Sequence, residues 1–586
     1  MNIQKKILKS QELARIGKLD AAIDLLNEVI TKFANQPQAH SMLGLFYILK
    51  KQAHLAKDHL EKSLSILFDP TTAENLIVLM MQTQSWELAH QWSKKLIESR
   101  QYKVNHLINH AMILREMGNV MESLDYYQTT INKYPNNIEV KISYGFTLNK
   151  LEKFEEAIAI YHQGLVMDKK NYSLLYNLGI SYLNNYDYDN ALIYLNLAKE
   201  ENKNSVDLWL TLAVCQSKKR DFEKAFESVS FAEKIQPNNP LIPFQMGTLY
   251  MQQDNNDEAL KFFKMTLEYD PHHIEALYHI GLIQLKQQRY QEAIPYYQNR
   301  TIRKNNRIGK FNDMSLPILD KNTDLIIAWE QGIGDQILLI SLIEEIKDKV
   351  KSITYISQDK LYPLLKINYP NLTMIKESES DEFIGKKPNY KKINMGSMMG
   401  YIDDWKLFFK KSHTWTVDQK LKKYYKNKYK PKTELLMGIS WMSANKKIGD
   451  EKTIPLYEFT ELIADRHVVS LQYGNVQNEI SEINSKQKCN IMHDQDLDYY
   501  DDLNGLAALV SICDVVITCS NVTAHIAGRL GVKTYLITPK NFGNIWYWNS
   551  DSESFSKWYP SVQIFRQTTD GVWSEEIKKI KDLLIS

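Results

Sequence analysis

The stretch Leu325-Ile-Ile-Ala-Trp-Glu-Gln-Gly-Ile-Gly-Asp-Gln-Ile-Leu-Leu-Ile340 combines a short strand, a glycine turn and the start of a helix. Its first residues form an apolar, β-prone run, and Gly332 and Gly334 allow a tight turn with positive φ. Apolar residues after Asp335 recur at helical spacing, which predicts a helix that starts at this aspartate. Ligands of open α/β sheets bind where strands end and helices begin, so Asp335 is either a ligand-site residue or a helix cap.

The chain downstream of this stretch alternates between short apolar runs and helical segments. This alternation predicts two α/β domains with parallel sheets, at residues 324–432 and 433–586. The basic segment 421–432 is interpreted as the connection between them, with phosphate binding as the alternative reading. The predicted strands are 324–329, 352–357 and 372–375 in the first domain, and 436–441, 467–471, 489–492, 514–518 and 534–537 in the second.

The chain upstream repeats with a period of 34 residues. One position of each unit carries a small residue, namely Gly145, Gly179, Ala213, Gly247 and Gly281. An alanine follows twelve residues later, at Ala157, Ala191, Ala225, Ala259 and Ala293, and a large side chain four residues after that, at Tyr161, Leu195, Val229, Phe263 and Tyr297. Small residues at these positions predict two helices that cross closely in each unit. The pattern resembles the tetratricopeptide repeat.

About nine such units are expected in an α-solenoid at residues 1–307, followed by a linker at 308–323. Stacked units form a superhelix with a groove that suits an extended partner such as a peptide or protein. Extending the period backwards assigns Gly17, Gly44 and Gly118 to earlier units. The unit at 71–103 matches the pattern poorly, so we expect an irregular stretch there. Four of the histidines within the array are interpreted as helix-surface or turn residues rather than metal ligands; they are His106, His110, His272 and His273.

The composition is that of an ordinary globular protein of two or three domains. The 586 residues carry 72 basic and 70 acidic side chains, and this formal net charge of +2 gives no reason to expect a nucleic-acid partner. No uninterrupted apolar run is long enough for a transmembrane helix or a signal peptide, so we expect a cytoplasmic protein. The four cysteines form no CxxC pair and are expected to be free, buried thiols.

Four motifs in the second half resemble glycosyltransferases. They are Trp329-Glu-Gln-Gly-Ile-Gly-Asp335; Gly438-Ile-Ser-Trp441 with Asp450-Glu-Lys-Thr-Ile-Pro-Leu456; Ser520-Asn-Val-Thr-Ala-His-Ile-Ala-Gly-Arg-Leu-Gly531; and Trp558-Tyr-Pro-Ser-Val-Gln-Ile-Phe-Arg566. Together with the repeats they resemble the bacterial tetratricopeptide-linked glycosyltransferases, which are related to the heptosyltransferases and more distantly to the O-linked N-acetylglucosamine transferases. The resemblance implies a GT-B pair of Rossmann-like domains with a nucleotide-sugar donor in the second domain.

The resemblance also implies a role for individual residues. Asp335 matches the catalytic base, with Glu330 in the same loop as the alternative, and Lys452 matches a lysine that faces the donor diphosphate. The remaining residues of the implied donor site are Gly332, Gly334, Ser440, Gln472, Ser520, Asn521, Thr523 and His525. Heptosyltransferases carry Asp-Thr-Gly-Leu where this chain has Ser520-Asn-Val-Thr523, so the resemblance leaves the donor sugar open.

No metal or other cofactor is expected for this chemistry. Asp494, Asp496 and Asp498 have the spacing of a metal-binding DxD motif, but they precede an expected helix start near Leu503, where acidic residues suit the helix dipole. The expected function is therefore metal-independent, inverting transfer of a sugar from a nucleotide donor to a hydroxyl, on a protein held by the repeats. Two alternatives are an inactive repeat scaffold that only binds partners, and a transferase that acts on a glycolipid or surface polysaccharide.

Overall fold

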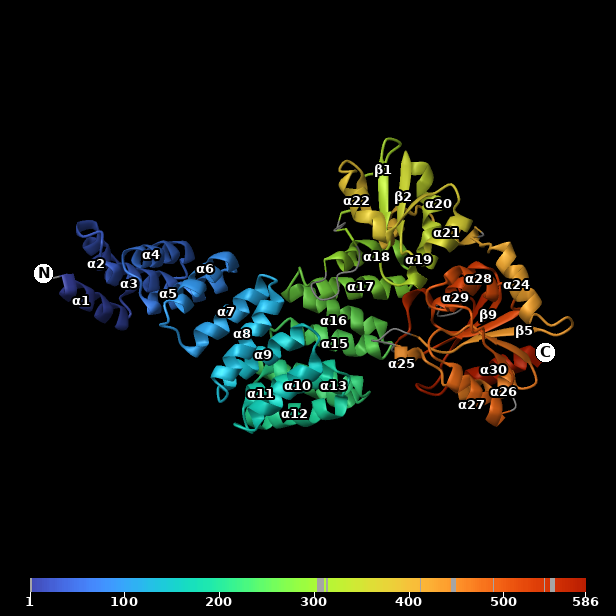
Figure 1. Cartoon of the computed structure of the whole chain (residues 1–586), viewed down its shortest axis with the longest axis horizontal. Helices are drawn as coiled ribbons and strands as arrows, with labels where there is room; N and C mark the ends of the chain where they lie inside the picture. Colours follow the sequence, from blue (N-terminus) through green and yellow to red (C-terminus); the bar gives the residue numbers. More distant parts are fainter. Residues whose placement is uncertain are drawn as a thin grey trace. The chain divides into compact units, whose positions relative to one another are not determined.

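The computed structural model describes residues 3–302, 310–311, 315–411, 413–443, 449–487, 489–541, 543–548 and 554–585. The chain divides into two compact units, Met1–Pro237 and Asn238–Ser586, which are treated separately below (Figure 1). The expected linker at 308–323 lies partly outside the described residues. Among the described residues, no helix combines the length and apolar character needed to cross a bilayer.

Residues 3–302, all of which are described, form nine consecutive pairs of α-helices and a closing 3-10 turn. The first unit contains α1 (Ile3–Arg15), α2 (Leu19–Lys32), α3 (Pro37–Leu49), α4 (Ala53–Ile66), α5 (Pro70–Gln82), α6 (Trp86–Glu98), α7 (Val104–Glu116), α8 (Val120–Lys133), α9 (Ile138–Lys150), α10 (Phe154–Leu165), α11 (Tyr172–Asn184), α12 (Tyr188–Glu201), α13 (Val206–Lys218) and α14 (Phe222–Ile235). The second unit begins with α15 (Leu241–Gln252), α16 (Asn256–Tyr269), α17 (Ile274–Lys286), α18 (Tyr290–Tyr297) and η1 (Gln298–Thr301). The predicted helical solenoid is confirmed.

The periodic glycines let the two helices of a repeat approach closely. A Cβ atom added to Gly145 would lie 2.5 Å from the ring of Tyr161, and one added to Gly179 would lie 2.6 Å from Leu195. The partner is in each case the large residue sixteen positions later. The same relation holds for Gly44 with Leu60, Gly247 with Phe263, and Gly281 with Tyr297. The close helix crossing predicted from these residues is therefore correct.

Gly17 and Gly118 lie at another position of the repeat than the glycines at the helix crossings. Both have positive φ, +79° and +86°, in the turn between the two helices of a repeat, and a Cβ atom added to either of them would have nothing within 4 Å. Non-glycine residues adopt the same left-handed conformation in the other repeats: Lys51, Gln84, Glu152, Tyr186, Arg220, Asp254 and Gln288. The unit at 71–103 is regular, although an irregular stretch was expected there. Its helices α5 and α6 form an ordinary pair, and the turn between them comes one residue earlier than the period of 34 would place it.

Two of the histidines are buried rather than on the helix surface. His106 is 4% and His110 is 1% exposed, and the Nδ1 atom of His110 lies 2.8 Å from the hydroxyl of Ser93. Burial lowers the pKa of His110 to about 4, so its ring is neutral at pH 7. His272 and His273 lie in the turn before α17, as expected.

The first sheet has four parallel strands in the order β3-β2-β1-β4. The strands are β1 (Asp324–Ala328), β2 (Ser352–Ser357), β3 (Thr373–Lys376) and β4 (Lys391–Asn394). The helical segments around them are α19 (Ile333–Leu339), η2 (Ile340–Leu342), α20 (Ile343–Ile346), η3 (Lys347–Lys349), α21 (Tyr362–Asn368), η4 (Glu377–Glu379), α22 (Ser380–Gly385), η5 (Met395–Tyr401) and α23 (Trp405–Lys410). Strand β4 was not predicted, because only Ile393 in its Lys-Lys-Ile-Asn sequence is apolar.

The second sheet has six parallel strands in the order β10-β9-β8-β5-β6-β7. The strands are β5 (Leu436–Ser440), β6 (His467–Ser470), β7 (Ile491–Met492), β8 (Val515–Cys519), β9 (Lys533–Thr538) and β10 (Val562–Arg566). The helical segments are α24 (Gln419–Tyr429), α25 (Gly449–Lys452), η6 (Leu456–Phe459), α26 (Thr460–Ile463), α27 (Gln477–Gln487), α28 (Leu503–Val510), α29 (Val522–Arg529), η7 (Trp546–Trp548) and α30 (Ser574–Ile585). The basic segment 421–432 mostly forms α24.

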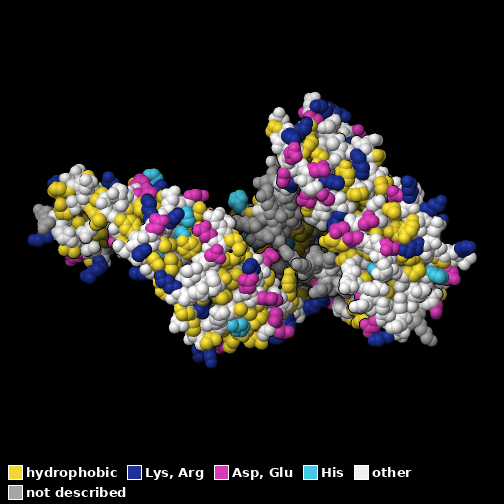
Figure 2. Space-filling model, viewed as in Figure 1, with side chains coloured by type: hydrophobic (Ala, Val, Ile, Leu, Met, Phe, Trp, Pro, Cys, Tyr) yellow, Lys and Arg dark blue, Asp and Glu magenta, His cyan; other side chains and the backbone are white. Residues whose placement is uncertain are grey.

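One continuous hydrophobic core joins the last repeat to both sheets. Tyr297 of α18, Ile327 of β1 and Val516 of β8 all belong to this core, whereas Ile326 and Ile517, on the other faces of the two sheets, belong to separate cores. Within this unit, α19 from the first sheet packs against α29 from the second (Figure 1). On the face shown in Figure 2, basic and acidic side chains are interspersed, with no large area of one sign.

Candidate active site

The two sheets reverse their strand order at β1 and at β5, and the motif residues follow these strands. In each sheet the chain moves to one side of the central strand and then returns to the other side. Such a switch point leaves a crevice at the carboxyl ends of the strands, where open α/β sheets bind ligands. Asp335 lies in the first turn of α19, which follows β1 after a short loop, and Ser440 ends β5.

The turn after β1 differs in detail from the prediction. Gln331 has positive φ (63°), whereas Gly332 is extended with φ −87° and precedes the first residue of α19. The helix thus begins at Ile333, two residues before Asp335. The Gly332 N–H donates a hydrogen bond of 3.0 Å to Oδ2 of Asp335, so this side chain does satisfy a free donor at the helix start.

Asp335 also has the electrostatic character of a base. Burial raises the pKa of its half-buried carboxyl to about 6, and the charge of Glu330 adds to the shift. The Gly332 N–H and the charge of Lys452 act in the opposite direction without cancelling it. A general base is most effective when its pKa lies near the working pH. Capping and proton acceptance are therefore compatible in this one side chain.

Gly334 brings α19 into direct contact with His525 of α29. A Cβ at Gly334 would lie 2.6 Å from Cδ2 and 2.7 Å from Nε2 of His525. The imidazole is 2% exposed, its Nδ1 lies 3.0 Å from the Tyr559 hydroxyl, and its centroid lies 4.8 Å from that of Trp548. Burial, together with the charges of Arg529 and Lys452, lowers the pKa of His525 to about 3. His525 is thus a neutral side chain between the two sheets.

Lys452 and Tyr547 complete the surroundings of Asp335. Lys452 is 4% exposed, and burial lowers its pKa although the charges of Cys519 and Asp335 act to raise it. Burial and then the charge of Asp335 raise the pKa of Tyr547, so its hydroxyl remains protonated. The structure therefore brings together three predicted residues, Asp335, Lys452 and His525, and adds Tyr547, which the motifs did not identify.

Four other predicted donor-site residues are bonded to one another at the ends of β5, β6 and β8. Oε1 of Gln472 accepts hydrogen bonds from the Ser440 hydroxyl (3.0 Å) and from the Trp441 N–H (2.8 Å). Asn521 donates to the Ser440 hydroxyl (2.7 Å) and accepts from the Thr523 N–H (3.0 Å), which caps α29. These four residues are thus hydrogen-bonded to one another at the carboxyl-end edge of the second sheet. Ser520, which is 4% exposed, joins β8 to this cap.

An ion pair connects the segment after the last repeat helix to the loop between β1 and α19. Arg300 of η1 donates to both carboxylate oxygens of Glu330, with Nε–Oε2 at 2.9 Å and Nη2–Oε1 at 2.8 Å, and both side chains are fully buried. The Gly396 N–H also donates to Glu330, and Arg300 reaches the hydroxyl of Ser397 at 2.8 Å. Glu330, the alternative base, is thus held in an ion pair. The repeat pattern contained no signal for Arg300, which follows the last repeat helix.

Other titratable groups from the sequence analysis have local partners. Asp494 accepts from Lys428 (3.0 Å) and from the Tyr429 hydroxyl (2.8 Å), while Asp498 accepts the N–H groups of Tyr500 and Asp501. The four cysteines are free and buried, as predicted.

The comparisons with known proteins identify the repeats. Models of the tetratricopeptide repeat match residues 107–137, 148–206 and 244–306. The chain therefore contains tetratricopeptide repeats, and it resembles proteins built from them. The bovine BBSome complex member BBS4 is 26% identical over 188 residues, which cover 32% of this chain and 36% of that protein. Protein FlbA of Caulobacter vibrioides is 23% identical over 283 residues, which cover 44% of this chain and 46% of FlbA.

The chain thus spans between a third and a half of the length of these relatives. Among solved structures, MamA is 23% identical and matches with a TM-score of 0.25 over 27% of this chain and 92% of its own. A tetratricopeptide repeat protein from Parabacteroides merdae is 16% identical, with a TM-score of 0.33 over 48% of this chain and 94% of its own. The names of these four proteins do not refer to a transferase. The resemblance to glycosyltransferases therefore rests on the four sequence motifs alone.

Proposed function

We propose that this chain is an inverting, metal-independent glycosyltransferase whose repeats hold its protein acceptor. The observation that carries the proposal is the carboxylate of Asp335, which has a pKa of about 6 and lies at the switch point of one parallel sheet. Its helix, α19, packs against α29 of the second parallel sheet. A nucleotide sugar is the co-substrate, and no metal or other cofactor is required. The two sheets would act as the Rossmann-like halves of a GT-B pair.

In this mechanism Asp335 takes the proton of the acceptor hydroxyl as that oxygen attacks the sugar carbon. The carbon–oxygen bond to the nucleotide breaks at the same time, and negative charge develops on the departing diphosphate. Lys452 offsets this charge, because an electrostatic interaction in a buried site is stronger than in water. The N-terminus of α29 offers further N–H groups to the diphosphate, apart from the Thr523 N–H, which Asn521 already accepts.

The second candidate is a repeat scaffold without catalysis, and the comparisons favour it. The matched family models cover only repeats, and one similar protein is by name a member of a complex. A peptide or protein in the repeat groove is common to both candidates. The two differ in whether the residues around Asp335 turn over a nucleotide sugar.

Turnover of a nucleotide-sugar panel separates the two candidates. The purified full-length protein is incubated with each nucleotide sugar, and mass spectrometry scores the released nucleoside diphosphate. We expect hydrolysis or transfer with one donor class, and loss of this turnover in Asp335→Asn. A protein that turns over no donor, with or without a bound partner protein, would be a scaffold.

A further inference from the structure

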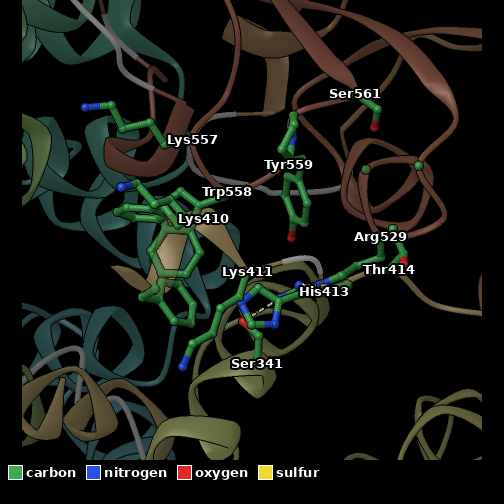
Figure 3. A pocket seen from close by; sticks show the side chains of 15 residues that line it. Ser341, Lys410, Lys411, His413, Thr414, Arg529, Lys557, Trp558, Tyr559 and Ser561 are labelled. Atoms are coloured by element: carbon green, nitrogen blue, oxygen red, sulfur yellow. Dashed lines mark hydrogen bonds between the residues drawn. The ribbon is translucent and has the colours of Figure 1, made fainter. Parts of the chain in front are cut away.

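A pocket lies near the C-terminal end of α29, away from the helix start that the proposed transferase uses. Its volume is about 290 Å³, close to the lower end of the range for small-molecule sites. Residues of α23 and the segment after it form one wall, and the segments 528–531 and 557–561 form the other (Figure 3). The pocket is therefore built from both α/β regions of the Asn238–Ser586 unit.

The lining of this pocket is strongly basic. Lys410, Lys411, Lys557 and Arg529 line it, and among the described residues no carboxylate side chain belongs to the lining. Lys411 is paired with Glu345. Lys557 donates to the neutral side-chain oxygen of Gln288, so this bond leaves its positive charge uncompensated.

Arg529 also lines the pocket and adds to the positive charge of its lining. It is 1% exposed, and its guanidinium donates to neutral oxygens, among them the carbonyls of Ile337 (3.0 Å) and Leu338 (2.7 Å). Lys410 and Lys557 project to the same side of the pocket (Figure 3). Positive charge in a concave site attracts an anion.

Three buried polar atoms of the lining have no hydrogen-bond partner within the described part of the chain. They are Nε2 of His413, Nε1 of Trp558 and Oγ of Ser561. Buried polar groups are normally paired, so each such atom calls for an explanation. These atoms are themselves almost inaccessible, so a ligand would pair with them only after the lining moved.

The lining also contains aromatic side chains from both walls. Phe409 and Trp558 line the pocket with ring centroids 5.3 Å apart, and Trp558 is 6% exposed. Much of this aromatic surface packs within the protein, against Trp405 for example. The part that faces the pocket suits a flat ring, because aromatic faces stack favourably.

We propose that this pocket binds a phosphorylated aromatic compound of nucleotide size, with its phosphate on Lys410 and Lys557 and its ring against Phe409 and Trp558. The site is separate from Asp335 and does not depend on the proposed transferase activity. Tyr559 stands between the two sites, because it lines the pocket and its hydroxyl contacts His525. A bound ligand would thus also contact the junction of the two sheets.

Calorimetry with ADP, on the full-length protein, tests this proposal. We expect ADP to bind, and the double variant Lys410→Ala/Lys557→Ala to weaken this binding at least tenfold. Inorganic pyrophosphate, which lacks the ring, and adenosine, which lacks the charge, should each bind at least fivefold more weakly than ADP. Lys406→Ala is the matched control, because Lys406 is an exposed lysine of α23 that does not line the pocket, and it should leave ADP binding unchanged.

The variant Lys452→Ala separates this pocket from the candidate active site. ADP binding that persists in Lys452→Ala and is lost in Lys410→Glu would support the pocket. The proposal would be overturned if ADP gave no binding heat at millimolar concentration, or if the double variant bound ADP like the unchanged protein. It would also be overturned if Lys452→Ala alone removed all binding, since ADP would then occupy only the candidate active site.

Discussion

Replacing Gly334 by alanine tests the contact between α19 and α29 on which the candidate site depends. The added Cβ would lie 2.6 Å from the His525 ring, a separation that real Cβ contacts essentially never show. The ring cannot easily move away, because Tyr547, Trp548 and Tyr559 surround it. The backbone of α19 or α29 must shift instead.

The expected cost follows from two opposing effects. Overpacking a tightly packed interior costs about 1–3 kcal/mol. Replacing a glycine within a helix by alanine contributes about 0.5–1 kcal/mol of stabilisation. Gly334→Ala should therefore destabilise the protein by roughly 0.5–2 kcal/mol. Gly385→Ala is the matched control, because Gly385 also lies in a helix but a Cβ added there would have nothing within 4 Å. It should instead stabilise the protein by about 0.5–1 kcal/mol.

Urea unfolding followed by tryptophan fluorescence measures both changes, since eight of the 11 tryptophans lie after Pro237. In a His525→Ala background the clash disappears, so Gly334→Ala should lose its cost, with a coupling energy of about 1–3 kcal/mol. If Gly334→Ala stabilised the protein as Gly385→Ala does, the close approach of the two helices would be refuted.

Three further predictions concern the donor site, the base and the repeats. Lys452→Ala should weaken nucleotide-sugar binding by about 1.5–3 kcal/mol, and an unchanged calorimetric Kd would place the diphosphate elsewhere. Activity should rise with pH through about 6 as Asp335 loses its proton. Glu330→Gln removes a charge that raises this pKa, so the rise should move to lower pH; a shift to higher pH would contradict the assignment. Tyr186 has φ +63°, so Tyr186→Gly should stabilise the repeats by about 0.5–1 kcal/mol, whereas Gly118→Ala should destabilise them by about 1 kcal/mol in thermal unfolding.

The repeats were predictable because one physical constraint recurs in the sequence. Each close helix crossing needs a small residue opposite a large one, and pairs such as Gly145 with Tyr161 show this at fixed spacing. The turn between the two helices of a repeat left no periodic glycine signal, because non-glycine residues adopt its left-handed conformation at seven positions and glycines only at 17 and 118. Strand β4 was missed because two of its four residues are lysines.

The candidate site was predictable only in part. The family resemblance placed Asp335 and Lys452 in one site, and in the structure both follow strands at the switch points of their sheets. Spacing alone does not reveal contacts between remote segments, such as Arg300 with Glu330 or Gly334 with His525. It also does not distinguish a side chain that faces a ligand from one bonded within the protein, as Gln472 and Asn521 are.

The central claim is that Asp335 is the base of a sugar transfer, and the transfer rate of Asp335→Asn tests it most directly. Asparagine keeps the oxygen that accepts the Gly332 N–H but cannot take a proton at neutral pH. The account predicts a melting temperature and donor binding close to those of the unchanged protein, with a transfer rate lower by at least about a hundredfold. Transfer at close to the normal rate would contradict the claim and leave Asp335 as a helix-capping residue.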